Sequence, residues 1–300
     1  MDTMEPAQTP EEIRDNLEVT EKGRIWQSIQ NCKHVLEHDP CLRGAVCRNE
    51  MTCQIDIKKK VPWKRRGVQM TDTDMNNLSL YLEKNYGLTS DRVIAKAIDI
   101  VANDNSFHPI IDLLESLKWD GRPRIAGMLN HFFGAENPEY SGEVMKMHML
   151  AAISRLYEPG KKYDIMLCLV GGQGTGKSTF FKYLAIQDEW FTDDVKRLDD
   201  KKVYEYLQGH WIVEMSEMNA VANAKSIEET KSFLSRQKDT YRIPYERRAE
   251  DRYRQCVFCG TSNDLAFLPF DRTGNRRFGP VKVCPEKAET TIYRDEKGSR

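Results

Sequence analysis

One glycine-rich run holds the residues best suited to chemistry in this chain. It reads Gly171-Gly172-Gln173-Gly174-Thr175-Gly176-Lys177-Ser178 and fits the pattern G-x-x-x-x-G-K-[ST]. In this pattern the glycines let backbone N–H groups wrap a chain of phosphates, the lysine reaches the β- and γ-phosphates, and the serine hydroxyl ligates Mg²⁺. We therefore expect the segment from Gly171 to Thr179 to bind ATP, with Lys177 acting in catalysis and Ser178 holding Mg²⁺.

The flanks of this run supply the strand and the helix that such a loop requires. Residues 164–170 are mostly apolar and short, which is typical of a buried parallel strand. Residues 179–184 can continue as a helix, whose positive N-terminal end would face the phosphates. The order strand, glycine loop, helix favours nucleotide binding over a chance glycine-rich turn.

A second apolar segment, residues 210–217, ends in two acids. A carboxylate at the end of a parallel strand can hold Mg²⁺ or orient the attacking water. If the strand ends at Val213, Glu214 is the metal-side acid; if it runs to Ser216, Glu217 is. A strand followed by an acidic helix cap is the alternative interpretation, and the upstream loop favours the nucleotide role.

Other polar positions follow further along the chain. Residues 256–260 read as a buried strand, and the amide of Asn263 just beyond it could hold the attacking water. Arg276 and Arg277 could neutralise transition-state charge in a neighbouring subunit, although loop arginines commonly face solvent. The C-x-x-C of Cys256 and Cys259 lies inside the predicted strand, which favours buried thiols over a redox or zinc site.

Two basic segments contain aromatic residues and could contact nucleic acid. Residues 236–248 combine arginines for phosphates with aromatic faces for bases, and Arg252 and Arg254 extend the segment. We expect its DNA contacts at Arg242, Tyr245, Arg247 and Arg248, with a solvated hairpin as the alternative. Residues 58–66 surround Trp63 with lysines and arginines, but a short basic run of this kind is more often a solvated loop.

Composition narrows the class of protein. The chain has 300 residues, of which 40% are hydrophobic and 30% charged, with a net charge of −1. Any binding of a polyanion must therefore come from local patches. No apolar run approaches the ~20 residues of a membrane span, and the N-terminus lacks a signal-peptide core. We expect a cytoplasmic protein with no membrane partner.

The remaining segments predict two domains. Residues 1–20 form a flexible lead-in, residues 21–130 a mainly helical N-terminal domain that binds DNA or a partner, residues 131–285 the nucleotide-binding core, and residues 286–300 a charged tail. Apolar spacing predicts helices over residues 23–37, 72–85, 90–102, 110–117 and 141–156, with Thr71 or Asp72 capping the second.

Several pieces of the chain, taken together, resemble the virulence-associated E family. They are Trp119-Asp120-Gly121, the run from Gly171 to Ser178, Trp211-Ile212-Val213-Glu214, Arg242-Ile243-Pro244-Tyr245, Gly260-Thr261-Ser262-Asn263 and Thr273-Gly274-Asn275-Arg276-Arg277-Phe278. Members of that family are P-loop ATPases of phages, plasmids and pathogenicity islands, similar to superfamily-three helicases and to phage primase-helicases. The resemblance covers roughly residues 70–283.

The resemblance implies an α/β fold, an AAA+-like parallel sheet with helices on both faces, and a hexameric ring on single-stranded DNA. The Ser216-Glu217 pair matches the second-motif acid of the primase-helicases, which favours Glu217 as catalytic acid and Mg²⁺ ligand with Glu214 beside it. Asn263 matches the sensor position, Arg276 and Arg277 the arginine-finger region, and residues 241–254 a DNA-binding hairpin. The chain departs from the family in having no aspartate–glutamate pair at the second motif.

The leading hypothesis is an ATP-dependent DNA helicase that acts in the replication of a phage or other mobile element in the bacterial cytoplasm. A primase or an initiator would be a further partner, because no primase motif is visible in the chain. The alternative is an ATP-gated initiator or loader scaffold that binds DNA with little unwinding. A small-molecule kinase is disfavoured, since nothing suggests an acceptor pocket.

Overall fold

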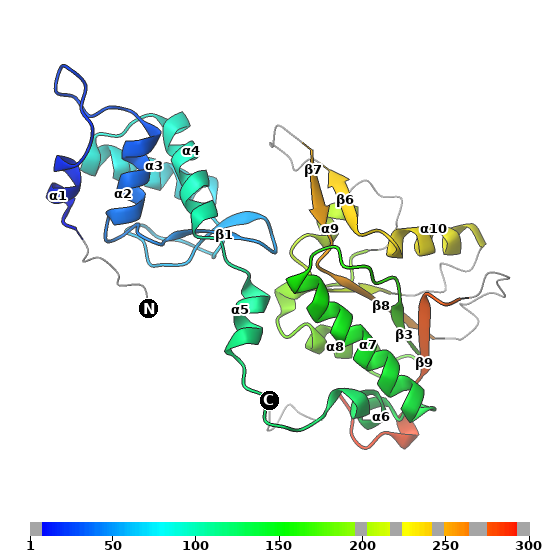
Figure 1. Ribbon diagram of the computed structural model, residues 1–300. Helices are drawn as coiled ribbons and strands as arrows, with labels where there is room; N and C mark the ends of the chain where they lie inside the picture. Colours follow the sequence, from blue (N-terminus) through cyan, green and yellow to red (C-terminus); the bar gives the residue numbers. More distant parts are fainter. Residues whose placement is uncertain (1–7, 196–202, 217–223, 242–248, 264–274, 293–300) are drawn as a thin grey trace. The chain divides into compact units, whose positions relative to one another are not determined.

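The computed structural model describes residues 8–195, 203–216, 224–241, 249–263 and 275–292 (Figure 1). The chain divides into two compact units, Met1–Leu113 and Leu114–Arg300. Within the described ranges, no helix is both long enough and apolar enough to cross a lipid bilayer.

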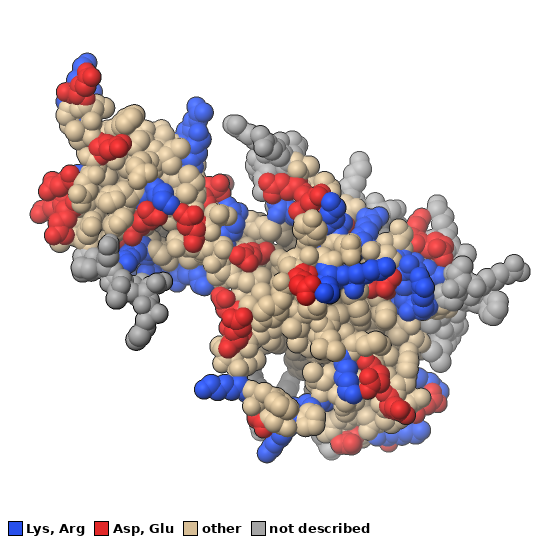
Figure 2. Space-filling view, viewed as in Figure 1, with Lys and Arg blue, Asp and Glu red and all other residues tan. Residues whose placement is uncertain are grey.

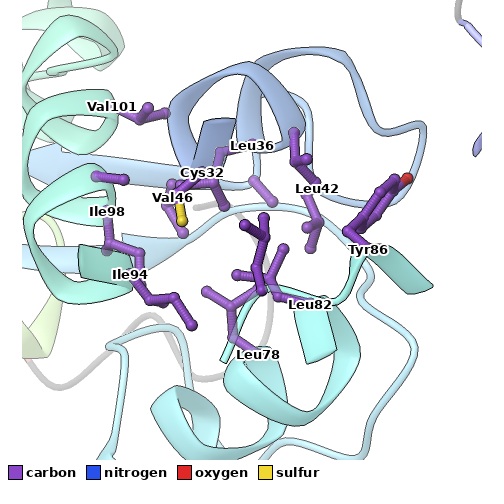
Figure 3. Close-up of a cluster of buried hydrophobic side chains, with 14 of the residues drawn as sticks. Cys32, Leu36, Leu42, Val46, Leu78, Leu82, Tyr86, Ile94, Ile98 and Val101 are labelled. Atoms are coloured by element: carbon purple, nitrogen blue, oxygen red, sulfur yellow. The ribbon is translucent and has the colours of Figure 1, made fainter. Parts of the chain in front are cut away.

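The first unit packs helices and one β-hairpin around a single core. Its elements are α1 (Pro10–Asp15), α2 (Ile29–His38), β1 (Val46–Asn49), β2 (Gln54–Ile57), α3 (Asp72–Tyr86) and α4 (Asp91–Asp104), followed by α5 (Pro109–Ser116) at the division between the units. Figure 3 shows the core side chains converging from these elements, among them Leu36, Leu82 and Ile98, each fully buried. The predicted mainly helical N-terminal part is confirmed, and the antiparallel pair β1–β2 is an addition to it.

Local chemistry sets the helix ends in this unit. Thr71 caps α3 in a reciprocal capping box with Asp74, and Gly87 ends the helix in the left-handed region at φ 67°. Helix α2 begins only at Ile29, later than the apolar spacing predicts, because the Ser28 hydroxyl caps it by accepting from the N–H of Asn31 at 3.1 Å.

Asp74 of this capping box also bonds to residues 58–66, the basic segment that the sequence offered as a possible nucleic-acid contact. The indole Nε1 of Trp63 and the Nε of Arg65 each donate to Asp74 Oδ1 at 2.9 Å. The Lys58 ammonium lies over the Phe107 ring, 3.5 Å from its centroid. Trp63 is half-buried and hydrogen-bonded, so it is not an open stacking platform, and these contacts favour an internal structural role for the segment.

The second unit is built on a five-stranded sheet in which every pairing is parallel. In spatial order the strands are β4 (Phe191–Thr192), β5 (Ile212–Met215), β8 (Val257–Ser262), β3 (Met166–Val170) and β9 (Phe278–Lys282). Every residue of β3 is buried, as expected for a parallel strand covered on both faces. The predicted α/β class is confirmed.

Helices cover both faces of this sheet (Figure 1). On one face, α9 (Val203–Leu207) and α10 (Ala224–Leu234) contribute Val203 and Phe233 to a cluster with Val213 and Phe258 of the strands. The other face carries α7 (Pro138–Tyr157) and α8 (Lys177–Leu184). Gly279 of β9 admits α7, because a Cβ there would lie 2.9 Å from Val144 Cγ1.

Smaller elements complete the unit. They are η1 (Ile125–Gly127), α6 (Met128–Phe133), η2 (Asp188–Trp190), η5 (Pro285–Lys287) and the antiparallel pair β6 (Lys238–Tyr241) and β7 (Glu250–Tyr253). Both η1 and α6 contact α7, so they belong to the second unit. Strand β7 leads directly into β8, which places the β6–β7 pair at the edge of the sheet where the parallel strands begin.

Candidate nucleotide-binding site

The glycine-rich run forms the turn between β3 and α8. Gly174 and Gly176 adopt left-handed backbone conformations at φ 78° and 84°, which only glycine takes without strain. Gly176 is the N-cap of α8, no side chain caps the helix, and its first turn contains no acid. The first N–H groups of α8 are therefore available to an anion. Gly171 is confined, since a Cβ there would lie 2.3 Å from Val283 Cγ2.

Lys177 folds back onto this loop. Its ammonium donates to the carbonyl oxygens of Gly171 at 2.6 Å and Gly172 at 2.7 Å. Burial lowers the pKa of Lys177, while the nearby charge of Glu214 acts in the opposite direction. The loop thus holds a positive charge at the place where the sequence predicts the phosphates. This ammonium group is bonded to backbone oxygens, which phosphate oxygens could replace.

Glu214 is the acid that the fold brings to this loop. It lies within β5 and is completely buried, and its Oε1 accepts hydrogen bonds from Ser178 Oγ at 2.8 Å and Thr261 Oγ1 at 2.7 Å. The neighbours Val213 and Met215 point to the α9–α10 face, so alternation along β5 turns Glu214 toward α8. The strand runs to Met215, and Glu214 inside it contacts Ser178.

The surroundings of Glu214 shift its protonation. Burial raises the pKa of its carboxyl group, and the hydrogen bonds from Thr261 and Ser178 offset part of that rise. The charge of Asp193, just past β4, raises the pKa further. The second oxygen, Oε2, is buried and has no hydrogen-bond partner in the described part of the chain. An unpaired carboxylate oxygen beside a hydroxyl group is an arrangement that a cation would satisfy.

These ligands suit Mg²⁺. A serine hydroxyl and a carboxylate are the hard oxygen donors that this ion prefers, and Mg²⁺ at phosphate sites commonly takes only one or two carboxylates beside substrate oxygens and water. Across the described ranges, no group of three His, Cys, Asp or Glu side chains could form a protein-only metal cage. The residues present therefore fit an ion shared with a bound phosphate chain.

The other predicted ATP-site positions surround this centre or lie outside the described ranges. Gln173 and Gly174 are exposed at the tip of the loop, and Thr175 Oγ1 donates to the Gly172 carbonyl at 3.1 Å. Asn263 is exposed directly after β8, at the same edge of the sheet as the loop. Glu217 lies outside the described residues.

Arg276 and Arg277 precede β9, whereas the glycine loop follows the parallel strand β3. The arginines and the loop therefore lie at opposite ends of the strands. The Nε of Arg277 donates to Ser235 Oγ at 2.9 Å and lies 3.3 Å from Asp164 Oδ2. Arg276 is exposed and has no ion pair within the described ranges. A five-residue strand spans about 16 Å, so neither arginine belongs to its own chain's phosphate site.

The predicted DNA-binding segment is a hairpin whose arms are β6 and β7, while Arg242, Tyr245, Arg247 and Arg248 lie outside the described residues. Arg254 at its base faces inward: its Nε donates to Asp239 Oδ2 at 2.6 Å, and its guanidinium lies 4.3 Å from the Phe233 ring centroid. Arg252 is largely covered and lies over the Tyr241 ring. Arg254 therefore anchors the hairpin, which corrects the expectation that it extends the DNA-facing surface.

Charge is mixed on the face of the second unit that Figure 2 displays, where acidic and basic side chains are interspersed. On the hairpin arms, Lys238 pairs with Asp251 at 2.5 Å. The arms alone carry no field of one sign, in keeping with the net charge of −1.

Thr261 is the site residue that sequence reasoning missed. It is buried in β8, and its register partner in β3 is Leu169. Its signal was weak: a threonine two residues before Asn263 shares its face of the strand, but the sequence does not say which acid lies opposite. Only the strand order, with β8 between β5 and β3, brings it to Glu214.

Comparison with known proteins gives a family match, and solved structures of similar fold are found as well. A family model described as the virulence-associated protein E-like domain matches residues 114–298, more than half of the chain. Two solved structures of the NrS-1 C-terminal region, both A-form apo structures, align with TM-scores of 0.46 and 0.47 at 16% and 15% identity. Each alignment covers 85% of this chain but only 61% and 60% of the solved chains, so this chain spans about three fifths of their length. No curated protein matches the chain.

Proposed function

Because the chain belongs to the virulence-associated protein E-like family, we propose that it is an ATP-dependent DNA helicase that acts in the replication of a phage or other mobile element. One observation carries the proposal: Ser178, at the start of α8, donates to the buried carboxylate of Glu214 two strands away in the sheet. A glycine loop, a lysine at its mouth and an acid held against the loop serine are the parts that phosphoryl transfer from a nucleotide requires.

The described residues divide the work as follows. ATP phosphates take the place of the Gly171 and Gly172 carbonyls as partners of the Lys177 ammonium, which neutralises charge on the β- and γ-phosphates. The N-terminal N–H groups of α8 hold the phosphate chain. Ser178 and Glu214 are the residues that would hold Mg²⁺, which would supply positive charge to stabilise the negative charge on the phosphates.

The remaining roles rest on sequence matches. We assign orientation of the attacking water to Glu217 and Asn263, and the metal side to Glu214 in preference to Glu217. The opposite-edge position of Arg276 supports its action on a neighbouring subunit's ATP, and hence a ring. Arg242, Tyr245, Arg247 and Arg248 grip single-stranded DNA beyond the hairpin arms.

The test combines hydrolysis, strand separation and mass. The purified chain is mixed with ATP and Mg²⁺, with and without single-stranded DNA, and phosphate release, unwinding of a forked duplex and particle mass are measured. A helicase hydrolyses ATP faster with the strand, separates the fork and assembles into a ring. An initiator or loader would give a different result. It would hydrolyse ATP slowly at a rate that single-stranded DNA does not change, and it would assemble on DNA without separating the fork.

A further inference from the structure

The carboxylate of Glu214 is held by a second hydroxyl, that of Thr261, to which the sequence analysis assigned no role. Thr261 Oγ1 donates to Glu214 Oε1 at 2.7 Å, as close as the bond from Ser178 at 2.8 Å. Both donors address the same oxygen. The other oxygen, Oε2, stays buried without a partner among the described residues. Two donors on one oxygen leave the second oxygen free for a ligand and fix the direction in which it points.

The position of Thr261 in the sheet explains why it can do this. Glu214 pairs in register with Cys259, and Thr261 stands two residues further along β8 on the same face. Its hydroxyl therefore reaches the acid on β5 from the neighbouring strand. As a β-branched residue in a strand, Thr261 has few χ1 rotamers, so its hydroxyl is directed by the backbone.

Ser178 has a second task in the proposed function. There its oxygen also ligates the metal, so it serves the ion as well as Glu214. The glutamate side chain has three rotatable bonds, and a second donor restricts the orientation of its carboxylate further. Thr261 is buried, with 7% of its surface exposed, and is the donor that does not depend on the ligand.

We propose that Thr261 is a positioning residue, which orients Glu214 so that its second oxygen meets the Mg²⁺ of bound nucleotide. The inference deepens the proposed function and relies on its nucleotide site, but not on hydrolysis or DNA translocation. Outer-shell groups that orient metal ligands typically affect metal affinity by ~10–100-fold.

The experiment measures the dissociation constant of a fluorescent ATP analogue with Mg²⁺ and again with EDTA, on the full chain. The constant with EDTA divided by the constant with Mg²⁺ reports the metal contribution separately from the fold of the loop. Thr261→Val, which keeps the shape and removes the hydroxyl, should lower this ratio ~10-fold or more. Thr261→Ser should restore it, and the EDTA constant should stay the same throughout.

Thr192→Val is the matched control, because Thr192 is a buried threonine at the same edge of the sheet whose hydroxyl accepts from the Asp194 N–H. It should leave the ratio unchanged. If Thr261→Val misfolds, the comparison of wild type with Thr261→Ser and Thr261→Ala decides. A hydroxyl-free variant with the full Mg²⁺ ratio, an equal loss in both constants, or a wild type without any Mg²⁺ effect would each overturn the inference. A wild type that shows the Mg²⁺ effect but no hydrolysis would remove the helicase proposal and leave this one standing.

Discussion

Ser178 and Glu214 are separated by 36 positions in the sequence, yet the serine hydroxyl donates to Glu214 Oε1 at 2.8 Å. The contact spans the width of strand β8, which lies between the strands that lead to these two residues. It joins the glycine-rich loop to the buried acid of β5. Five predictions test this centre and the elements that support it.

Removal of the Lys177 amine should abolish ATP turnover and weaken nucleotide binding at least ~10-fold, since the ammonium is the loop's own positive charge. The variant is Lys177→Ala, measured by phosphate release and by fluorescent-nucleotide titration. Lys182→Ala on the same helix, where the lysine pairs with Asp188 at 2.9 Å, is the control. Normal turnover by Lys177→Ala would remove the site assignment.

Glu214→Gln should stabilise the fold while it stops hydrolysis. Burial raises the pKa of Glu214 above its ordinary value of 4.5, so the folded state disfavours the charged form and loses stability as the pH rises. Glutamine still accepts from Ser178 and Thr261 but carries no charge. We expect a melting temperature about 2–4 °C higher at pH 7.5, a gain that shrinks as the pH falls toward 4.5 and is absent below it.

The comparison variant for that measurement is Glu143→Gln, because Glu143 lies on α7 with 62% of its side chain exposed. It should leave the melting temperature unchanged at both pH values. A lower melting temperature for Glu214→Gln at pH 7.5 would mean that the charged carboxylate contributes to stability, contrary to the burial argument.

The two arginines before β9 should behave differently. Arg276→Ala should keep the melting temperature and ATP binding but lose hydrolysis, because Arg276 is exposed, has no ion pair within the described ranges and lies at the opposite end of the strands from the glycine loop. Arg277→Ala should lower the unfolding free energy by about 1.5–3 kcal/mol, since Arg277 bonds to Ser235 and lies beside Asp164.

Mixed assemblies test whether Arg276 acts on a neighbouring subunit. Lys177→Ala subunits lack a working site but supply Arg276, and Arg276→Ala subunits have the reverse defect. Mixing the two inactive variants should restore part of the hydrolysis. Activity that stays at zero in a mixture shown by mass to be co-assembled would contradict an arginine supplied in trans.

The base of the β6–β7 hairpin should depend on one buried ion pair. Asp239→Asn leaves the Arg254 guanidinium buried without its charged partner, and we expect it to cost about 3–5 kcal/mol in unfolding free energy. Asp251→Asn makes the same change in the exposed pair with Lys238 and should cost no more than about 1 kcal/mol. Urea unfolding measures both, and equal costs would contradict the anchoring role of Arg254.

Acid sensitivity should arise in part from His148 on α7. The imidazole is fully buried, neither ring nitrogen has a partner in the described structure, and burial lowers its pKa from 6.5 to about 4. The unfolded chain binds this proton first as the pH falls, so stability is lost below pH 6.5 until about pH 4. Between pH 7 and 5 this single group accounts for about 2 kcal/mol.

His148→Leu should remove that part of the pH dependence, because leucine fills the site without a titrating group. His131→Leu is the control, since the His131 side chain is 45% exposed. The measurement is the difference in unfolding free energy between pH 7 and pH 5. An unchanged difference in His148→Leu would show that the histidine does not titrate on unfolding in this range.

The sequence predicted the parts of this protein whose signals are local. The helix over residues 72–85, with Thr71 as a candidate cap, and the strand before the glycine loop are confirmed by α3 and β3, because a capping box and an apolar run are properties of neighbouring residues. Residues 58–66 had a local signal too, a basic run around an aromatic, but Asp74 engages Trp63 and Arg65. The sequence alone does not show whether a basic residue will bind nucleic acid or pair with an acid of its own chain.

What the sequence left open depended on the order of strands. Whether Glu214 or another acid meets the loop serine is decided by the face of β5 and by the strand between β5 and β3, neither of which has a local signature. Thr261 was overlooked for the same reason. Arg254 lies in a basic, aromatic segment of the kind that contacts DNA, but its side chain forms a buried ion pair. Only its packing against Phe233, which the sequence does not show, distinguishes these two roles.

The missing aspartate at the second motif has a physical counterpart in this sheet. Strands β5 and β3 are two spacings apart, about 9.6 Å, and Glu214 stands one residue before the end of β5. An acid placed so far back must have reach, and aspartate is shorter than glutamate by one carbon–carbon bond, about 1.5 Å. The width of the one intervening strand therefore favours glutamate over aspartate at position 214, because the longer side chain can contact the serine.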